Sequence, residues 1–400
     1  MKTTPRTAEE AAEAVRAAVA RGQGVAVRGS GSRRSWQPPL PDPEQTLLLD
    51  TTGLAGPGRL RAENLSATFP AGLPLTAVKA QLAEAGLWLP LEHADAPSAT
   101  LGGCLAGGFT NPLRWSRGLP RDWVLGLELV DSAGRLLSLG GELVKNVAGY
   151  DLVRFHLGAW GRSGLMTAAT VRLLPLPEAE ATVTRSFASP AEAAGALRAA
   201  GRDHSHPATL EIVGGPQGLQ AMARIMGDAG QVRARADALG AVLGGGEVLL
   251  GGESAETWRA YERQRGAIEE AHAWRLKLGV TAPGLEEVFA LAAEACAGRS
   301  WTLAGQAGNG VYTLYWSDES GPLPVLGAVH GRLGARGFVT AEGAAAARVF
   351  GAPGWSGFPP HPARAQDSVD AALIAAVAPG RVFNPQLLEG PSAPGSGAAR

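Results

Sequence analysis

Cysteine is nearly absent from this 400-residue sequence, which contains only Cys104 and Cys296. The two thiols could pair in principle, but nothing in the sequence requires it, and so low a count is typical of a reducing compartment. Neither residue stands in a metal-ligand spacing. We therefore expect a protein of a reducing compartment without a metal site.

Charge is also scarce, because Asp, Glu, Lys and Arg make up 18% of the chain and the formal net charge is -1. The Lys and Arg residues are scattered, which argues against a nucleic-acid-binding face. No apolar run approaches the roughly 20 residues that cross a bilayer. The first 21 residues are charged and Ala-rich and lack the apolar core of a signal peptide. The sequence therefore predicts a soluble chain.

Glycine is abundant, with 55 residues, and proline contributes 28. Glycine without a collagen-like period indicates tight turns and close approaches of the backbone. That composition suits a protein that wraps loops around a cofactor, although a GC-rich genome would also raise the glycine and proline counts. The 10 Trp residues are expected mostly in the core or at an interface, with flavin stacking by Trp36 as the alternative.

Hydrophobic periodicity and turn residues divide the chain into alternating strands and helices, which indicates an α+β fold. We find no internal repeat in the sequence, and the Pro/Ser/Gly/Ala-rich end, 391–400, is expected to be disordered. The expected helices are 8–21, 75–85, 152–158, 189–200, 218–226, 255–272, 286–297, 323–333 and 368–378. The expected strands are 24–27, 47–50, 67–69, 124–131, 135–139, 165–174, 210–213, 276–280, 311–316 and 337–340.

Three glycine-rich segments carry the chemistry that we can recognise. The first, 25–32, reads VAVRGSGS, and its glycines free consecutive backbone N–H groups that suit a pyrophosphate, although an ordinary tight turn has the same composition. The second, 98–108, reads SATLGGCLAGG and suits either a flat ligand or a close helix–strand contact. The third runs from VKNVAGYDL at 144–152 into GAWGRSGLM at 158–166, where Asp151 can cap a helix.

The order of these segments resembles that of the FAD domain of the vanillyl-alcohol-oxidase/PCMH family. Within that family, R-D-x-V-L-G, K-N-V-A-G-Y-D and a late F-N-P are typical of the E-type FAD-binding subunits of glycolate oxidase. They appear here at 121–126, 145–151 and 383–385. The similarity is strong over about residues 22–175 and weak through 180–370. One departure is the family's G-T-L-G-V run, which reads GRSGL at 161–165.

The resemblance implies an architecture and a set of cofactor-binding residues. A PCMH-type FAD-binding domain of two α+β subdomains at 1–177 would be followed by a smaller α+β cap domain at 178–374 and a returning segment at 375–390. The first loop would hold the FAD pyrophosphate through backbone N–H groups, and the other segments would line the flavin and adenosine. The residues implied are Arg28, Gly29, Ser30, Gly31, Ser32, Thr100, Leu101, Gly102, Gly103, Cys104, Gly149, Asp151, Gly164, Leu165, Met166 and Asn384.

The first loop has no residue of the kind that attaches FAD covalently in this family, often a histidine, because it continues as Gly31-Ser32-Arg33-Arg34. We therefore expect FAD to be bound non-covalently.

Catalytic side chains are harder to find than a flavin site. Related enzymes that oxidise 2-hydroxy acids carry G-H-x-G-D-G-N-x-H, whereas the matching stretch at 305–313 reads GQAGNGVYT, with Gln306 and Thr313 in place of the histidines. Neither side chain titrates near neutral pH, so neither can act as a base. No nucleophile elbow, HExxH or CxxC is present. His204 and His206 are either solvated loop residues or a metal pair.

A flavin without a base indicates an electron-transfer or structural subunit of a glycolate or other 2-hydroxy-acid dehydrogenase complex. By resemblance, its partners would be a catalytic D-type flavoprotein and an iron–sulfur F-type subunit, in the cytoplasm or peripheral to the inner membrane through those subunits. Two alternatives stay open. One is an autonomous FAD-dependent alcohol or 2-hydroxy-acid oxidoreductase that uses Tyr150, Tyr312 or Arg114, and the other is a cofactor-free assembly scaffold.

Overall fold

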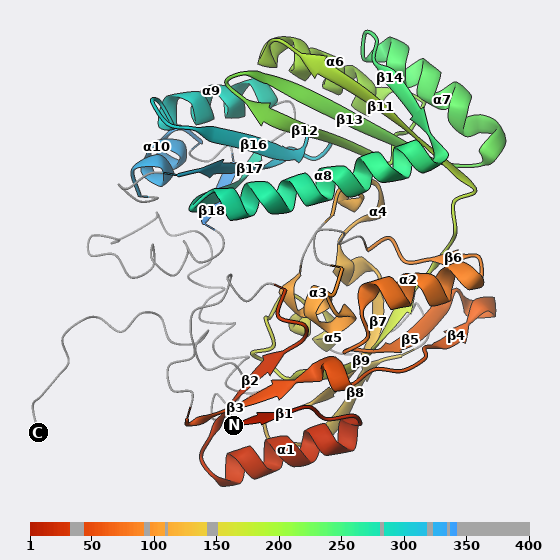
Figure 1. Ribbon diagram of the computed structural model, residues 1–400, viewed down its shortest axis with the longest axis vertical. Helices are drawn as coiled ribbons and strands as arrows, with labels where there is room; N and C mark the ends of the chain where they lie inside the picture. Colours follow the sequence, from red (N-terminus) through yellow and green to blue (C-terminus); the bar gives the residue numbers. More distant parts are fainter. Residues whose placement is uncertain are drawn as a thin grey trace, which may run out of the picture.

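The computed structural model describes residues 1–32, 44–91, 97–108, 111–141, 151–280, 284–317, 323–333 and 337–341. Two lobes are visible in Figure 1. The first lobe contains the described residues up to Pro175 except 111–117, which reach into the second lobe, and the second contains the described residues from Ala179 to Ala341. The mixed helix and strand content confirms the predicted α+β class.

The first lobe is built on a five-stranded sheet in the order β4-β5-β9-β7-β8 and a three-stranded parallel sheet in the order β1-β3-β2, while β6 and β10 form a separate pair. Helix α1 packs its buried face, with Ala11, Ala12, Val15 and Ala18, against β2, β3 and the β7–β9 pair. The bounds are β1 (Lys2–Thr3), α1 (Ala8–Ala20), β2 (Gly24–Arg28), β3 (Thr46–Asp50), β4 (Arg59–Arg61), β5 (Ser66–Pro70), α2 (Leu75–Glu84), β6 (Leu87–Trp88), α3 (Leu101–Gly107), α4 (Arg114–Arg117), β7 (Val124–Val130), β8 (Leu136–Gly140), α5 (Leu152–His156), β9 (Leu165–Arg172) and β10 (Leu174–Pro175).

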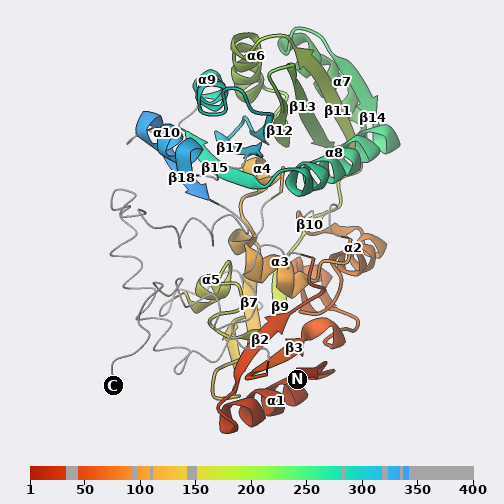
Figure 2. The ribbon, with the colours of Figure 1, turned by 60° about the vertical axis from the view of Figure 1, so that its left-hand side comes forward.

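The second lobe is one eight-stranded antiparallel sheet in the order β14-β11-β13-β12-β16-β17-β15-β18. Helices α6, α7, α9 and α10 cover one face, and α8 crosses the other, as Figures 1 and 2 show. The bounds are β11 (Ala179–Phe187), α6 (Pro190–Arg202), β12 (Thr209–Gly215), β13 (Gly218–Gly227), α7 (Ala229–Val242), β14 (Glu247–Leu250), α8 (Gly251–Ala271), β15 (Trp274–Val280), α9 (Leu285–Ala295), β16 (Trp301–Gln306), β17 (Val311–Trp316), α10 (Leu323–Leu333) and β18 (Gly337–Ala341).

A duplicated topology that the sequence did not reveal organises this second sheet. The strands and helices from β11 to β14 follow the order β-α-β-β-α-β, and those from β15 to β18 repeat it. The two halves meet where β12 and β16 pair antiparallel, with Glu211 opposite Gln306. The two halves share an order of elements without a visible sequence period, so the lack of a sequence repeat did not exclude a repeat of topology.

The predicted helix at 218–226 is also wrong, because these residues form β13. Its apolar residues Leu219, Met222, Ala223 and Met226 have the three- and four-residue spacing of a helix. The strand pairs with β11 on one side and β12 on the other, and most of its residues are buried. Because both faces of this strand are buried, apolar residues occur on both faces. Its sequence therefore shows no alternation of apolar and polar residues.

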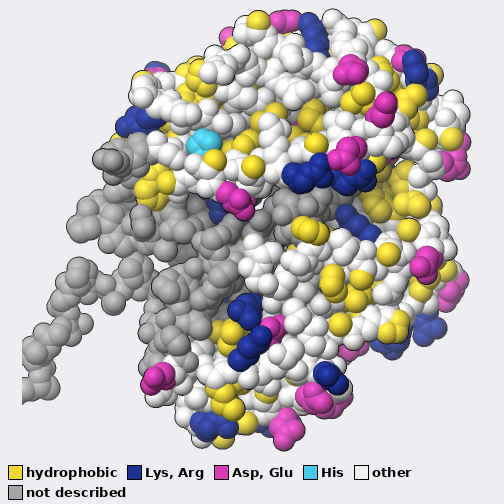
Figure 3. Space-filling model, in the orientation of Figure 1, with side chains coloured by type: hydrophobic (Ala, Val, Ile, Leu, Met, Phe, Trp, Pro, Cys, Tyr) yellow, Lys and Arg dark blue, Asp and Glu magenta, His cyan; other side chains and the backbone are white. Residues whose placement is uncertain are grey.

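The lobes touch through residues 111–117, which leave the first lobe and contact the second. Ser116 Oγ donates to the carbonyl oxygen of Ala208 at 2.6 Å, and Gln306 Nε2 donates to the carbonyl oxygen of Asn111 at 2.6 Å. Figure 3 shows Lys and Arg side chains gathered over α8. On this helix, Arg259 and Arg263 each form an ion pair with Glu256.

Candidate functional site

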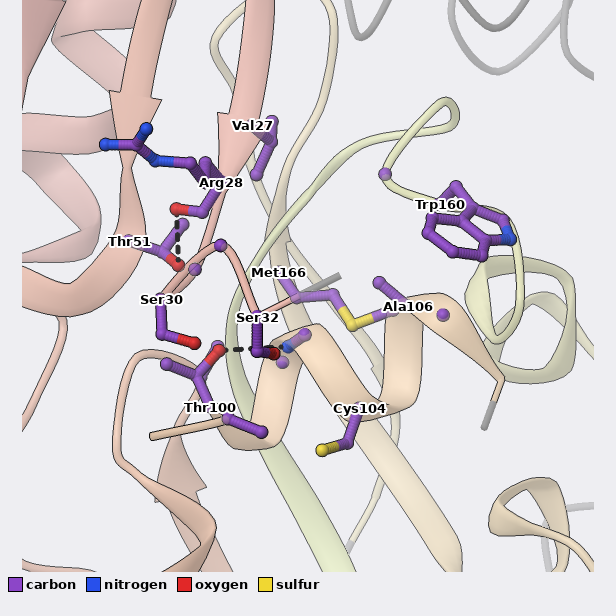
Figure 4. A pocket seen from close by; sticks show the side chains of 18 of the residues that line it. Val27, Arg28, Ser30, Ser32, Thr51, Thr100, Cys104, Ala106, Trp160 and Met166 are labelled. Atoms are coloured by element: carbon purple, nitrogen blue, oxygen red, sulfur yellow. Dashed lines mark hydrogen bonds between the residues drawn. The ribbon is translucent and has the colours of Figure 1, made fainter. Parts of the chain in front are cut away.

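One pocket in the first lobe is lined by all three glycine-rich segments, although their lining residues lie up to about 140 positions apart in the chain. Figure 4 shows Ser30 and Thr100 on one side of this pocket and Trp160 on the other. The described lining residues are Val27, Arg28, Gly29, Ser30, Gly31, Ser32, Thr51, Ala71, Ala99, Thr100, Gly102, Gly103, Cys104, Ala106, Gly107, Trp160, Gly161, Gly164 and Met166.

The first wall is the turn that leaves β2 after Arg28. The Arg28 side chain is directed to Asp50, with 3.3 Å between Nη2 and Oδ2, and Lys2 Nζ approaches the same carboxylate oxygen at 3.0 Å. Burial alone would raise the pKa of Asp50, but hydrogen bonds from Thr52, Lys2 and Arg28 outweigh it and lower that pKa to about 2. Asp50 therefore stays ionised and holds the guanidinium of Arg28 away from the pocket, which Arg28 lines with the rest of the residue.

The backbone of this turn is left to face the pocket. Thr51 Oγ1 donates to the carbonyl oxygen of Arg28 at 3.2 Å, which fixes the start of the turn, and Gly31 has a φ of +80°. In the described parts of the chain, no acceptor is bonded to the backbone N–H of Ser30, Gly31 or Ser32. Consecutive unbonded N–H groups in such a turn suit an anionic group such as a pyrophosphate.

The second wall is helix α3, which the sequence suggested only as a glycine-rich segment. Thr100 caps it by accepting from Gly103 N at 3.1 Å. The N–H groups of Leu101 and Gly102 donate to the carbonyl oxygens of Leu73 and Ala71, and that of Cys104 donates to Thr100. These donors are used within the protein, so this wall offers a flat surface to a ligand rather than hydrogen-bond donors.

Close approach explains two of the glycines in these walls. A Cβ on Gly29 would lie 2.4 Å from Thr100 Oγ1, so only glycine lets the first turn reach the start of α3. A Cβ on Gly102 would lie 2.8 Å from the Cβ of Ala71, so this glycine serves the packing of α3 on the strand end. The first glycine therefore shapes the pocket, and the second holds its wall in place.

The third wall is the loop from Leu157 to Gly164, which is tied to the end of α3. Gly158 N donates to Leu105 O at 3.0 Å, and Trp160 N donates to Ala106 O at 2.8 Å. Trp160 has a φ of +55°, a left-handed conformation that is costly for a residue with a side chain. The loop thus presents the indole of Trp160 at the rim of the pocket in a strained backbone conformation.

The remaining residues implied by the resemblance lie elsewhere or outside the described residues. Leu101 and Leu165 have fully buried side chains in the core of the first lobe. Asp151 caps α5 by accepting from Arg154 N at 3.0 Å, and it does not line the described pocket. Gly149 and Asn384 lie outside the described residues, as do Tyr150, Trp36 and the predicted helix at 368–378.

Several lining residues carried no signal in the sequence. Thr51 and Ala71 are ordinary residues at strand ends, and only the fold brings them to the pocket, whereas Ala99 stood inside the second recognised segment. Trp160 stood inside a recognised segment, but its left-handed backbone conformation cannot be read from composition. Together the described walls supply unbonded N–H donors, a flat glycine surface and an aromatic ring, and these fit a dinucleotide with a planar ring system.

The glycine-rich run at 305–313 forms the β16–β17 turn of the second lobe. Gly310 has a φ of +68°, and a Cβ on Gly308 would lie 2.5 Å from the ring of Trp115 in α4, which reaches across from the first lobe. Gln306 donates to Asn111 O and accepts from Asn309 Nδ2 at 2.5 Å. These residues therefore build a turn and a contact between the lobes.

A buried carboxyl lies beside this turn, on the sheet face covered by α8. Glu211 is inaccessible to solvent, and Tyr261 OH donates to its Oε2 at 2.6 Å. Burial raises the pKa of Glu211 to about 7, although Arg265 and the hydrogen bond from Tyr261 oppose the shift. Burial and the Glu211 charge raise the pKa of the neighbouring Tyr312. A carboxyl with such a pKa can hold a proton near neutrality.

The other residues that the sequence suggested for metal binding or catalysis do not line the pocket of the first lobe. His204 and His206 have ring centroids 6.3 Å apart, and in the described residues no group of three or more His, Cys, Asp or Glu side chains is arranged to hold a metal ion. Arg114 is half-buried, and burial followed by the charge of Arg121 lowers its pKa. No helix among the described residues is both long and apolar enough to cross a bilayer.

Comparison with known proteins gives one matching family model and several relatives. The family model described as an FAD binding domain matches residues 2–140. The glycolate oxidase subunit GlcE of Escherichia coli (strain K12) is 40% identical over 121 residues, which are 30% of this chain and 35% of that protein. The glycolate oxidase subunit GlcD of Bacillus subtilis (strain 168) is 34% identical over 157 residues, 38% of this chain and 33% of that protein. The matches therefore span about a third of the length of these relatives.

Solved structures share the fold over nearly the whole chain. An alkyldihydroxyacetonephosphate synthase superposes with a TM-score of 0.72 at 15% sequence identity, covering 96% of this chain and 76% of that one. At this level of identity the likeness concerns the fold alone. It confirms the predicted PCMH-type architecture.

Proposed function

We propose, from the premise that this chain carries a PCMH-type FAD-binding domain, that it binds FAD non-covalently in the pocket lined by its three glycine-rich segments. The observation that carries the proposal is that these distant segments line one pocket. The N–H groups of Ser30, Gly31 and Ser32 would hold the pyrophosphate, and the surface of α3 would lie along the planar ring. FAD, when bound, supplies the redox chemistry.

Non-covalent attachment is supported by the chemistry of the pocket wall. No histidine or tyrosine is found among its described lining residues, and Cys104 is 2% exposed and packed in the core of the first lobe. Acid precipitation of the purified chain tests this point. Yellow colour should stay in the supernatant, whereas colour on the precipitated polypeptide would contradict the proposal.

The proposed role is that of an FAD-binding subunit in a glycolate or other 2-hydroxy-acid dehydrogenase complex, with an electron-transfer or structural task. Similarity to GlcE supports it, as does the use of Gln306 in a contact between the lobes. The partners would be a D-type flavoprotein and an iron–sulfur subunit. We propose a cytoplasmic location or attachment to the inner membrane through those partners.

The same proposal places an FAD domain at 1–177, a cap domain at 178–374 and a returning segment at 375–390. In the described residues, all strands from β11 onward join one sheet and none joins the sheets of the first lobe, which supports the first boundary.

An absorbance spectrum of the chain, purified alone and with its co-expressed neighbours, tests the proposed role. Flavin absorbance in the chain alone, without reduction by glycolate or lactate until the partners are added, is the expected result. A colourless chain whose melting temperature does not change with added FAD would contradict FAD binding. Colourless protein that still co-purifies with a flavoprotein would instead indicate an assembly scaffold.

A second candidate is an autonomous FAD-dependent oxidoreductase for an alcohol or a 2-hydroxy acid. Its candidate base is Glu211, whose raised pKa lets it exchange a proton near neutral pH, but Glu211 is inaccessible to solvent and does not line the described pocket. Steady-state bleaching of the flavin by glycolate, lactate or another alcohol, with no partner present, would support this candidate.

A further inference from the structure

A buried polar pair lies directly behind the third wall of the pocket. His156, the last residue of α5, is 3% exposed, and Ser163 is 1% exposed. Their side chains meet with 2.7 Å between Nδ1 and Oγ. Because an imidazole nitrogen and a hydroxyl can exchange the roles of donor and acceptor, the neutral pair satisfies both groups.

The pair closes the loop that carries Trp160. His156 directly precedes this loop and Ser163 is its last residue but one, so the hydrogen bond joins the two ends of the loop across seven positions. The middle of the loop is held by the bonds from Gly158 N to Leu105 O and from Trp160 N to Ala106 O. The loop is therefore fixed at both ends by one side-chain pair and in the middle by α3.

The pair also abuts a residue that lines the pocket. Gly164 follows Ser163 directly, and a Cβ placed on it would lie 3.6 Å from His156 Cε1 and 3.2 Å from Val130 O. Loss of either partner would leave the other as a buried polar group without a hydrogen bond. A shift of the loop toward solvent would let water form a hydrogen bond with that group. Such a shift would displace Trp160, Gly161 and Gly164 together.

We propose that His156 and Ser163 act as a positioning pair, which holds the loop from Leu157 to Gly164, and the indole of Trp160 with it, against the dinucleotide bound in the pocket. The proposal rests on the proposed FAD-binding function. The pair does not touch the pocket itself, because neither residue is in its described lining. Its effect on the cofactor is transmitted by the backbone between Trp160 and Gly164.

A double-mutant cycle on the full chain tests the proposal, with Ser163→Ala, His156→Met and the double variant. Each single variant should weaken FAD binding about tenfold or more, since an unpaired buried polar group favours displacement of the loop. The visible circular dichroism of the bound flavin should change as its contact with Trp160 changes. The double variant leaves neither group of the pair unpaired. Its affinity for FAD should therefore be no lower than that of the single variant that binds FAD more weakly.

Thr170→Val is the matched control, because it removes one hydroxyl from the pair of Thr68 and Thr170, 2.8 Å apart in the same lobe and outside the described pocket lining. It should lower the melting temperature while the FAD dissociation constant and the flavin spectrum stay at the wild-type values. If Ser163→Ala and His156→Met behave like this control, or if the effects of the two singles simply add in the double variant, the positioning role is overturned.

Hydrogen exchange in the chain without FAD separates this inference from the proposed function. Ser163→Ala should speed exchange at the amides of Gly158 and Trp160, which the loop holds against α3. Unchanged exchange there overturns the positioning role even if FAD binds. A wild-type chain that binds no FAD overturns the proposed function, and the present proposal falls with it.

Discussion

The two lobes differ in which polar groups they leave for a ligand. In the first lobe, the backbone N–H groups of Ser30, Gly31 and Ser32 line a pocket and have no described acceptor, while the Arg28 side chain is bound to Asp50. In the second lobe, polar side chains such as Glu211 and Gln306 are bonded within the protein. The comparison supports the proposal that the main chain of the first lobe, rather than polar side chains of the second, binds the ligand.

The largest expected effect comes from closing the approach between the first turn and α3. Gly29→Val places a Cβ 2.4 Å from Thr100 Oγ1, and the β-branch adds further crowding. We expect FAD binding to weaken by more than about 100-fold, because overpacking and loss of the α3 cap each cost ~1–2 kcal/mol or more. A fluorescence titration with FAD measures it.

The control is the same substitution in the second lobe. At Gly195, inside α6, a Cβ would meet nothing within 4 Å, so Gly195→Val should bind FAD like the wild-type chain. Equal affinities for FAD in the two variants would show that the first turn is not part of the site.

The next largest effect concerns the buried carboxyl of the second lobe. The folded state raises the pKa of Glu211 from 4.5 to about 7, so between these pH values the folded state binds more protons than the unfolded state. The free energy of unfolding should therefore fall as the pH rises through this window, by up to about 3 kcal/mol. Glu211→Gln should flatten that part of the profile in urea unfolding, and a slope equal to that of the wild type would refute the assignment.

The first lobe should respond to pH in the opposite direction. Burial lowers the pKa of His156 from 6.5 to about 4, so the unfolded state binds more protons between these values. Stability from this residue should be complete above pH 6.5 and should be lost as the pH falls toward 4, by about 2–3 kcal/mol. Unfolding of His156→Gln across this range should show a weaker acid dependence, and an unchanged profile would contradict the burial of a neutral imidazole.

The smallest effect is a gain. Gly195→Ala, in the interior of α6, should raise the free energy of unfolding by ~0.5–1 kcal/mol, because alanine has the higher helix propensity. Thermal unfolding measures the gain, and FAD binding should not change. A loss of affinity for FAD would show that the second lobe influences the pocket, contrary to the difference between the two lobes described above.

The sequence predicted the first lobe better than the second, for a physical reason. The first turn, α1 and the β7–β8 hairpin are set by local signals, namely Gly31, the Thr7 cap and Gly134 in the turn. β13 lies between two strands under a layer of helices, so its apolar residues show no period of two. The strands β11, β14 and β16 and helix α7 were missed altogether, whereas the elements missed in the first lobe, β1, β4, β6, α3 and α4, are short.

The candidate site was predictable only in part. The glycines at 29, 31 and 164 mark turns that sequence reasoning recognised, and their order along the chain indicated a single site. The satisfied N–H groups of α3, the left-handed Trp160 and the pairing of His156 with Ser163 depend on contacts between distant segments. No local sequence pattern encodes such contacts. The surface of α3 and the pair of His156 and Ser163 could therefore be recognised only from the fold.

A structure of the full chain with FAD bound tests the central claim most directly. The account predicts that the pyrophosphate oxygens accept hydrogen bonds from the amides of Ser30, Gly31 and Ser32, with the ring system lying along α3. A dinucleotide found elsewhere on the chain, or a first turn whose amides face away from it, would contradict the account.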